Sequence, residues 1–325
     1  MSISYEGAII HVLDLAEGQP ILSKGLLDID DENEKFITKH IMNLFDNIVV
    51  SEAEFREESN ILDLIVDFAD DKFIEVSKRI ASRFFTYMTN YGNITAGDLL
   101  ITSFTKEEVN YLGILKLNYK EEFAHKVNYN NGNGGVTEII KHTSILPSKQ
   151  KVTEAILINL DTRQLRVLDK SKDKYISELF EIEKFLSTKE KLQVIEDATY
   201  EVIEEYFDNS LEAHTTFKQH VADAIFENNE IPIQNILDKT FEEYEEVKEA
   251  CNTRFTEYGL KDDTIVMNNN VAAKKYASHQ IKTSNGIEIK LPTSLVKDSS
   301  VIEFIQNPDG TTNIVLKNIS ELISK

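Results

Sequence analysis

The residues best suited to binding chemistry form a cluster of lysines and arginines in the middle of the chain. Residues 141–174 contain eight basic and four acidic side chains, although the whole chain of 325 residues has a formal net charge of −21. The eight are Lys141, Lys149, Lys151, Arg163, Arg166, Lys170, Lys172 and Lys174. Clustered ammonium and guanidinium groups are what contact with nucleic-acid phosphates requires. Lys170, Lys172 and Lys174 alternate, and in an extended stretch this spacing predicts that they share one face.

Acidic residues dominate the rest of the chain in two long stretches. The net charges are −12 for residues 1–140, +4 for 141–174, −15 for 175–265 and +2 for 266–325. A smaller basic group in the last segment contains Lys274 and Lys275. A chain this acidic is a poor candidate for coating DNA with its whole surface, but a local basic face still suits phosphate contact. Surface lysines that pair with neighbouring acids are the alternative explanation.

Two other stretches have compositions that are found in ligand-binding loops. In NNGNGG, Asn130 to Gly135, no Lys-Ser or Lys-Thr follows the glycines. A surface loop is therefore favoured over a phosphate-binding loop. The segment DIDDENE, Asp28 to Glu34, lacks the glycine and the final glutamate of a calcium loop. Acids favour the positive end of a helix dipole, so this segment predicts a helix N-terminus.

The histidines and the single cysteine show no spacing that is typical of a metal or nucleophile site. His214 and His220 are six residues apart on a predicted helix, which separates them by about 240° around its axis. Cys251 lies among carboxylates, which we expect to raise the pKa of its thiol. There is no Gly-x-Ser-x-Gly elbow and no H-E-x-x-H motif. We therefore expect no enzyme activity, no cofactor and no metal.

Strands and helices must position the basic segment. Alternating and continuous apolar runs predict strands at residues 3–15, 99–104, 109–117, 154–160 and 164–168. The last four form two hairpins, and Arg163 lies in the turn of the second. A first helix is predicted after residue 34. A second begins at Ser51, which has capping-box spacing with Glu54, and a third ends at Gly92.

The pattern becomes helical at Tyr175 and returns to strands in the last sixty residues. Ser187 and Glu190 form another capping box. The turn Asn307 to Gly310 predicts a closing hairpin. The expected fold is α+β, with an N-terminal antiparallel sheet and packed helices at 1–174. An acidic helical region with a C-terminal β-hairpin follows at 175–325.

Length and composition predict a folded cytoplasmic protein of about two domains. The single cysteine excludes an intramolecular disulfide and fits a reducing compartment. The first residues lack the basic and apolar regions of a signal peptide, and no apolar run approaches the roughly 20 residues that span a bilayer. We therefore expect no membrane association.

Four stretches support a more specific expectation. They are ISYEGAIIHVLDL; RIASRFFTYMTN with GDLLITSF and VNYLGILKL; EAILINLDTRQLRVLDK; and NGIEIKLPTSLVKDSSVIEFIQNPDGTTNIVLKNI. In these stretches the chain resembles the bacterial 37-kDa nucleoid-associated protein family. The resemblance covers most of the chain and implies a cytoplasmic protein of the nucleoid that associates with DNA directly or through partners. It carries over no catalytic or base-recognising residue.

Three functional hypotheses follow. The first is a non-enzymatic nucleoid-associated protein that contacts duplex DNA without sequence preference through the basic strand region, alone or as a homodimer. Lysine suits such phosphate contact better than bidentate base recognition. The second is an acidic interaction protein that binds a basic nucleoid protein or mimics DNA charge, without direct DNA contact. The third, a metal-dependent nucleic-acid enzyme, ranks last.

Overall fold

The computed structural model describes residues 3–66, 72–129, 135–145, 150–208, 210–267, 278–283, 285–292, 295, 298–307 and 311–321. Contacts within the chain divide it into two units, Met1–Phe185 and Leu186–Lys325. The boundary follows β9 (Ile182–Lys184), because β9 pairs with a strand of the first unit. The predicted division into domains after residue 174 stays a prediction.

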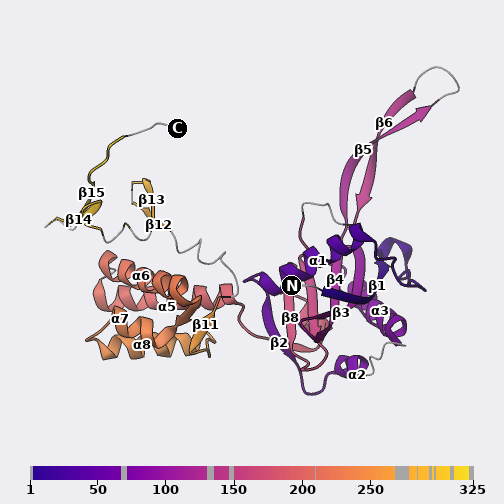
Figure 1. The fold of residues 1–325 in the computed structure, drawn as a ribbon, viewed down its shortest axis with the longest axis horizontal. Helices are drawn as coiled ribbons and strands as arrows, with labels where there is room; N and C mark the ends of the chain where they lie inside the picture. Colours follow the sequence, from indigo (N-terminus) through magenta and orange to yellow (C-terminus); the bar gives the residue numbers. More distant parts are fainter. Residues whose placement is uncertain are drawn as a thin grey trace. The chain divides into compact units, whose positions relative to one another are not determined.

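A seven-stranded antiparallel sheet forms the centre of the first unit (Figure 1). Its strand order is β1-β3-β4-β7-β8-β2-β9. The strands that precede β9 are β1 (Ile3–Leu13), β2 (Ser51–Phe55), β3 (Gly97–Lys106), β4 (Val109–Asn118), β7 (Glu154–Asn159) and β8 (Leu165–Asp169). The pairs β3–β4 and β7–β8 are the two predicted hairpins. The predicted α+β class with an antiparallel sheet is confirmed.

Helices cover both faces of this sheet. They are η1 (Leu15–Glu17), α1 (Asp31–Asp46), α2 (Asn60–Val66), α3 (Phe73–Tyr91) and α4 (Ile176–Leu179). Leu99 and Ile101 of β3 belong to the core that contains α3, whereas Leu100 belongs to the core that contains α1. Successive strand residues point to opposite faces. Burial on both faces explains why β3 and β4 are almost continuously apolar.

Local sequence signals at two helix starts have different outcomes. Asp30 caps α1, and its carboxylate accepts backbone N–H groups of Glu32 at 3.1 Å and Asn33 at 2.8 Å. The predicted helix N-terminus is confirmed. The predicted short helix at Ser51 is wrong, because that segment is β2, which pairs with β8 and with β9. Pairing with distant strands outweighs the capping-box spacing.

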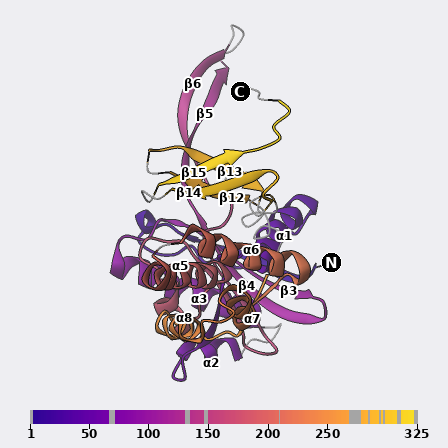
Figure 2. The same cartoon turned by 90° about the vertical axis from the view of Figure 1, so that its left-hand side faces the viewer.

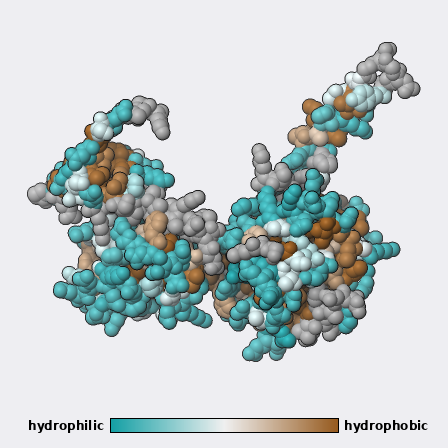
Figure 3. All heavy atoms as spheres, viewed as in Figure 1, coloured by the Kyte–Doolittle hydropathy of each residue, from teal (hydrophilic) through white to brown (hydrophobic). Residues whose placement is uncertain are grey.

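A two-stranded hairpin that the sequence analysis missed extends from the first unit. It consists of β5 (Lys120–Tyr129) and β6 (Gly135–Ser144), which pair over their whole length outside the seven-stranded sheet (Figure 1). We call it the arm. The predicted NNGNGG loop connects its strands, and residues 130–134 of that loop lie outside the described residues. Hydrophobic side chains lie at the surface along the arm (Figure 3).

Helices make up most of the described second unit (Figure 2). They are α5 (Thr188–Phe207), α6 (Leu211–Asn228), α7 (Ile233–Thr240) and α8 (Glu245–Glu257), accompanied by the paired strands β10 (Glu230–Pro232) and β11 (Thr264–Val266). The Ser187 hydroxyl accepts the Glu190 N–H at 3.3 Å, and the Glu190 carboxylate accepts the Ser187 N–H at 2.8 Å. This confirms the second predicted capping box. The sequence analysis missed α7.

Two further hairpins follow the helices. They are β12 (Ser278–Lys282) with β13 (Glu288–Pro292), and β14 (Ile302–Gln306) with β15 (Thr312–Leu316). The second is the predicted C-terminal hairpin, which is confirmed. The pairing of β12 with β13 was not anticipated from the sequence.

Two buried histidines make the first unit sensitive to acid. His11 of β1 accepts the Ser23 N–H through Nδ1 at 3.1 Å, and its Nε2 lies 3.0 Å from the Ser77 hydroxyl oxygen. His40 of α1 is buried, and its Nδ1 has no hydrogen-bond partner among the described residues. Burial lowers the pKa of both imidazoles from 6.5 to about 4. Between about pH 4 and pH 6.5, both rings therefore stay neutral in the folded protein, whereas the same rings bind protons in the unfolded chain.

Stability should fall as the pH decreases from 6.5 to about 4, since in this window the unfolded chain binds more protons than the folded protein. Each histidine contributes up to about 3 kcal/mol to this loss. His40→Leu removes one of the two contributions and should flatten the pH dependence. Urea unfolding of the variant and the original protein at pH 7 and at pH 4.5 measures the difference. If the free energy of unfolding falls by the same amount from pH 7 to pH 4.5 in His40→Leu and in the original protein, the prediction is wrong.

Candidate nucleic-acid interface

The largest group of predicted basic residues lies at one end of the central sheet. At this end β4 and β8 finish and β7 begins. Thr153 joins the strand ends, because its carbonyl accepts the Lys170 N–H at 2.9 Å and its hydroxyl oxygen lies 3.3 Å from the Asn118 amide nitrogen. Five lysines lie on the adjoining segments: Lys120, Lys151, Lys170, Lys172 and Lys174. We call them the sheet-end lysine group.

All five lysines are exposed, and none forms an ion pair with another residue in the described ranges. The loop that contains three of them is bent. The Asp169 carboxylate accepts the Ser171 N–H at 3.0 Å, and Lys174 has a left-handed φ of 51°. The prediction that Lys170, Lys172 and Lys174 lie in an extended stretch is therefore wrong, and their sharing of one face stays a prediction. An aspartate that binds nearby backbone favours a turn over a continued strand.

Two acidic side chains at this end of the sheet, Asp98 and Asp169, are held by hydrogen bonds within the protein. Asp98 accepts the Tyr119 hydroxyl at 2.5 Å, and burial raises the pKa of Asp98. Asp169 also accepts the Ile176 N–H at 3.0 Å. Asp173 is the exposed acid of the lysine loop. The lysine loop is therefore locally positive, with three exposed lysines and one exposed acid, whereas Glu17, Glu121 and Glu122 are exposed near Tyr119 and Lys120.

A buried polar network of side chains lies next to the lysine loop. Lys116 of β4 is 1% exposed, and its ammonium donates to the Thr95 carbonyl at 2.5 Å and also to the Asn118 side-chain oxygen. The same ammonium lies 3.6 Å from the carboxylate of Glu154, which accepts the hydroxyl of Tyr175. Burial lowers the pKa of Lys116, and the Glu154 charge opposes this shift. Burial and the Glu154 charge raise the pKa of Tyr175. The network thus connects β4 and β7 to the end of the lysine loop.

The two predicted arginines lie apart from this group. Arg163 is exposed in the β7–β8 turn, with a φ of 64°, at the other end of β8. The length of β8 separates it from Lys170 by roughly 20 Å. The Arg166 guanidinium lies over the Phe45 ring at 5.6 Å and 4.0 Å from the Glu52 carboxylate. The structure does not bring either arginine to the sheet-end lysine group.

The remaining predicted residues have different positions. Lys141 lies in the arm, where its ammonium is 2.9 Å from the Glu121 carboxylate. Lys149, Lys274 and Lys275 lie outside the described residues, and their role stays a prediction.

Several cations were not predicted as site residues, because they belong to the acidic segment 1–140. Lys120 joins the sheet-end lysine group only through the fold. Lys78, Arg79 and Arg83 of α3 line a cavity of about 800 Å³, in a stretch from residue 76 to 97 that contains no acid. That gap between acids was the signal available in the sequence. Two of these cations are neutralised, because Lys78 pairs with Glu75 at 2.7 Å and Arg83 with Glu181 at 2.6 Å.

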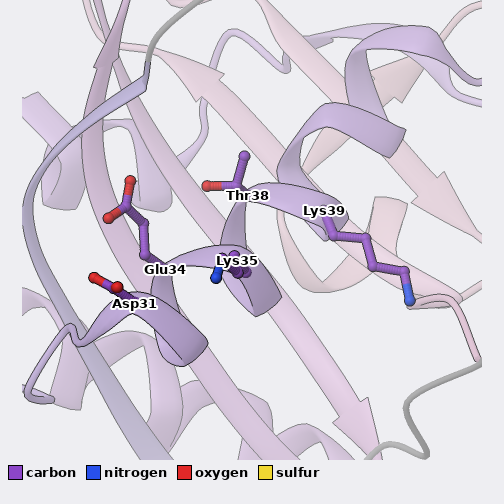
Figure 4. Close-up of a pocket in the computed structure, with 5 residues that line it drawn as sticks. All are labelled: Asp31, Glu34, Lys35, Thr38 and Lys39. Atoms are coloured by element: carbon purple, nitrogen blue, oxygen red, sulfur yellow. The ribbon is translucent and has the colours of Figure 1, made fainter.

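A second cavity, of about 450 Å³, lies over the first turns of α1 (Figure 4). Asp31 and Glu34 extend to one side of the helix and Lys39 to the other. Thr38 faces the Tyr5 hydroxyl at 2.9 Å. Acidic and basic side chains line this cavity in equal number, so it favours neither an anionic nor a cationic ligand.

Other reactive side chains are engaged in packing. Cys251 is fully buried, and its burial raises the pKa of the thiol to about 12. The expected direction is correct, but the cause is desolvation and not the neighbouring carboxylates. No group of three or more possible metal ligands occurs among the residues for which the structure gives positions.

Comparison with protein families gives a match to the family of the nucleoid-associated protein YejK over residues 9–323. The chain belongs to this family. The match spans both units and confirms the resemblance that the sequence indicated. Comparison with curated proteins yields no match.

Family membership establishes a role at the nucleoid, in the cytoplasm, with association with DNA and the organisation of the chromosome. None of the helices in the described ranges combines the length and apolar character that crossing a bilayer requires. For a member of the YejK family, the sheet-end lysine group is therefore the described surface to test first for contact with DNA.

Proposed function

We propose that the protein contacts duplex DNA directly, as a non-enzymatic nucleoid protein, through the sheet-end lysine group. The observation that supports this most strongly is the arrangement of charge at that end of the sheet. Five lysines extend into solvent, whereas Asp98, Glu154 and Asp169 are engaged in hydrogen bonds within the protein. Such a surface attracts phosphates although the net charge of the chain is −21.

The proposed contact is independent of DNA sequence. The group consists of lysines, which bind phosphate as point charges and lack the fork of donors with which arginine recognises guanine. The bent loop places these lysines on an irregular surface and not on a helix that would enter the major groove. The affinity should therefore depend on the charge of the DNA backbone and not on the base sequence.

A gel shift with the full chain and a duplex of arbitrary sequence tests this proposal. If five lysines neutralise phosphates, the logarithm of affinity should fall with the logarithm of salt concentration with a slope of about −4.5. Affinity should then decrease between about 10²-fold and 10³-fold from 50 to 200 mM salt. A second duplex of unrelated sequence should bind equally well.

The alternative function is an acidic protein that binds a basic nucleoid partner or mimics DNA charge. The same experiment separates the two. No shift at the lowest salt concentration, together with recovery of a basic protein by the immobilised chain, would overturn direct binding in favour of this alternative.

A further inference from the structure

The arm has one apolar and one charged face. In the β5–β6 register, Phe123 is opposite Lys141 and His125 is opposite Ile139, so these four side chains share a face with Tyr129. Phe123, Ile139 and Tyr129 are 76%, 79% and 82% exposed. The charged pair on this face, Glu121 and Lys141, neutralises itself at 2.9 Å. We call this the apolar face of the arm.

The opposite face carries alternating charges. It contains Lys120, Glu122, Lys126 and Glu138, together with the apolar cross-strand pair Ala124 and Ile140 and, near the tip, Val136. Residues 120–144 contain three lysines and three glutamates, so the arm has no net charge. It differs in this respect from the acidic remainder of the first unit, although Lys120 at its base also belongs to the sheet-end lysine group.

An isolated two-stranded hairpin with an uncovered apolar face is marginally stable in water. An exposed apolar face of this kind is typical of an interaction site. No other helix or strand of the described chain packs extensively against the arm, so the cover must come from another molecule.

We propose that the apolar face of the arm packs against the same face of a second copy of this chain, with the two arms antiparallel. The neutral charge of this face favours this occupant. A neutral face that contains a glutamate offers no attraction to DNA phosphates, and two copies that each carry −21 can approach most easily through neutral surfaces. Two identical faces around a twofold axis form a closed dimer.

The antiparallel arrangement follows from length and charge. Ten residues in each strand make the arm about 33 Å long. Antiparallel arms place the remainders of the two first units, which carry −10 each, at opposite ends of the paired arms. Parallel arms would place like charges side by side. In the antiparallel arrangement His125 and Ile139 lie at the middle of the contact, opposite their own copies.

Mass measurement by light scattering during size-exclusion chromatography tests the interface. The full chain should have twice its mass of 37.1 kDa. Ile139→Glu places a charge at the centre of the apolar face and should raise the dimer Kd at least about tenfold. Val136→Glu is the matched control, because it makes a similar change in the same strand on the opposite face, and it should leave the dimer intact. A monomeric original protein, or equal effects of the two variants, would overturn the proposal.

Cross-linking tests the arrangement even if Ile139→Glu folds poorly. His125→Cys should form a covalent dimer with a short bis-maleimide reagent, because packed sheets lie about 10 Å apart. Lys126→Cys, the next residue on the opposite face, should not. Cys251 is buried and leaves little background. Equal cross-linking of both variants would overturn the face assignment. A monomer whose DNA gel shift is abolished by Ile139→Glu would assign the arm to DNA instead and would overturn the dimer.

Discussion

Replacement of Lys170, Lys172 and Lys174 together by glutamate is expected to lower the affinity for duplex DNA at low salt by at least about 100-fold. Each of the three ammonium groups is exposed and has no ionic partner among the described residues, so each can contact a phosphate. Loss of three phosphate contacts should also flatten the salt dependence by about 2.7 in slope, because each contact contributes about 0.9. Gel shifts over a series of salt concentrations measure both quantities.

A matched control separates local charge from total charge. Lys189, Lys239 and Lys261 are exposed lysines of the acidic helical unit. Their joint replacement by glutamate changes the net charge by the same amount and should reduce affinity much less. If both triple variants lose affinity equally, long-range repulsion is the cause and the sheet-end lysine group is not the contact surface.

Replacement of Lys116 by alanine is expected to reduce the free energy of unfolding by about 3–5 kcal/mol. The ammonium is almost fully buried, and its removal leaves the Thr95 carbonyl and the Asn118 side-chain oxygen without their donor. It also leaves the Glu154 carboxylate, 7% exposed, without its cation. Urea denaturation followed by circular dichroism measures the loss.

An exposed ion pair provides the control for this variant. Lys78 forms a pair with Glu75 on the surface of α3, so Lys78→Ala should cost no more than about 1 kcal/mol. Adding Glu154→Gln to Lys116→Ala should recover part of the loss, because it removes the uncompensated charge. Similar stabilities of Lys116→Ala and Lys78→Ala would show that the network contributes little.

Predictions from the sequence were most accurate where the signal is local. The Ser187–Glu190 capping box, the helix start at the acidic segment Asp28 to Glu34 and the helix end at Gly92 all depend on residues within a few positions of each other. Hairpins with short connections were also predicted correctly, because β3–β4 and β7–β8 pair sequential neighbours.

Predictions failed where partners distant in sequence decide the structure. Ser51 belongs to a strand because β8 and β9 flank it. The Lys170 loop turns because Asp169 caps it and Tyr175 is tied to Glu154. The arm was missed because its strands carry charged and apolar residues on alternate faces, without the continuous apolar run that identified the buried hairpins.

The sequence by itself determined the family, the α+β class and the existence of a basic segment in an acidic chain, because composition, short-range spacing and charge counting are properties of the linear order. Only the tertiary structure decided which cations lie together. It placed Lys120 and Lys170 at the same end of the sheet and Arg163 and Arg166 away from that group. It also engaged Asp98 and Asp169 at this end in hydrogen bonds within the protein. The physical reason is that a surface charge depends on which strand ends meet, and strand pairing is established between residues far apart in the chain.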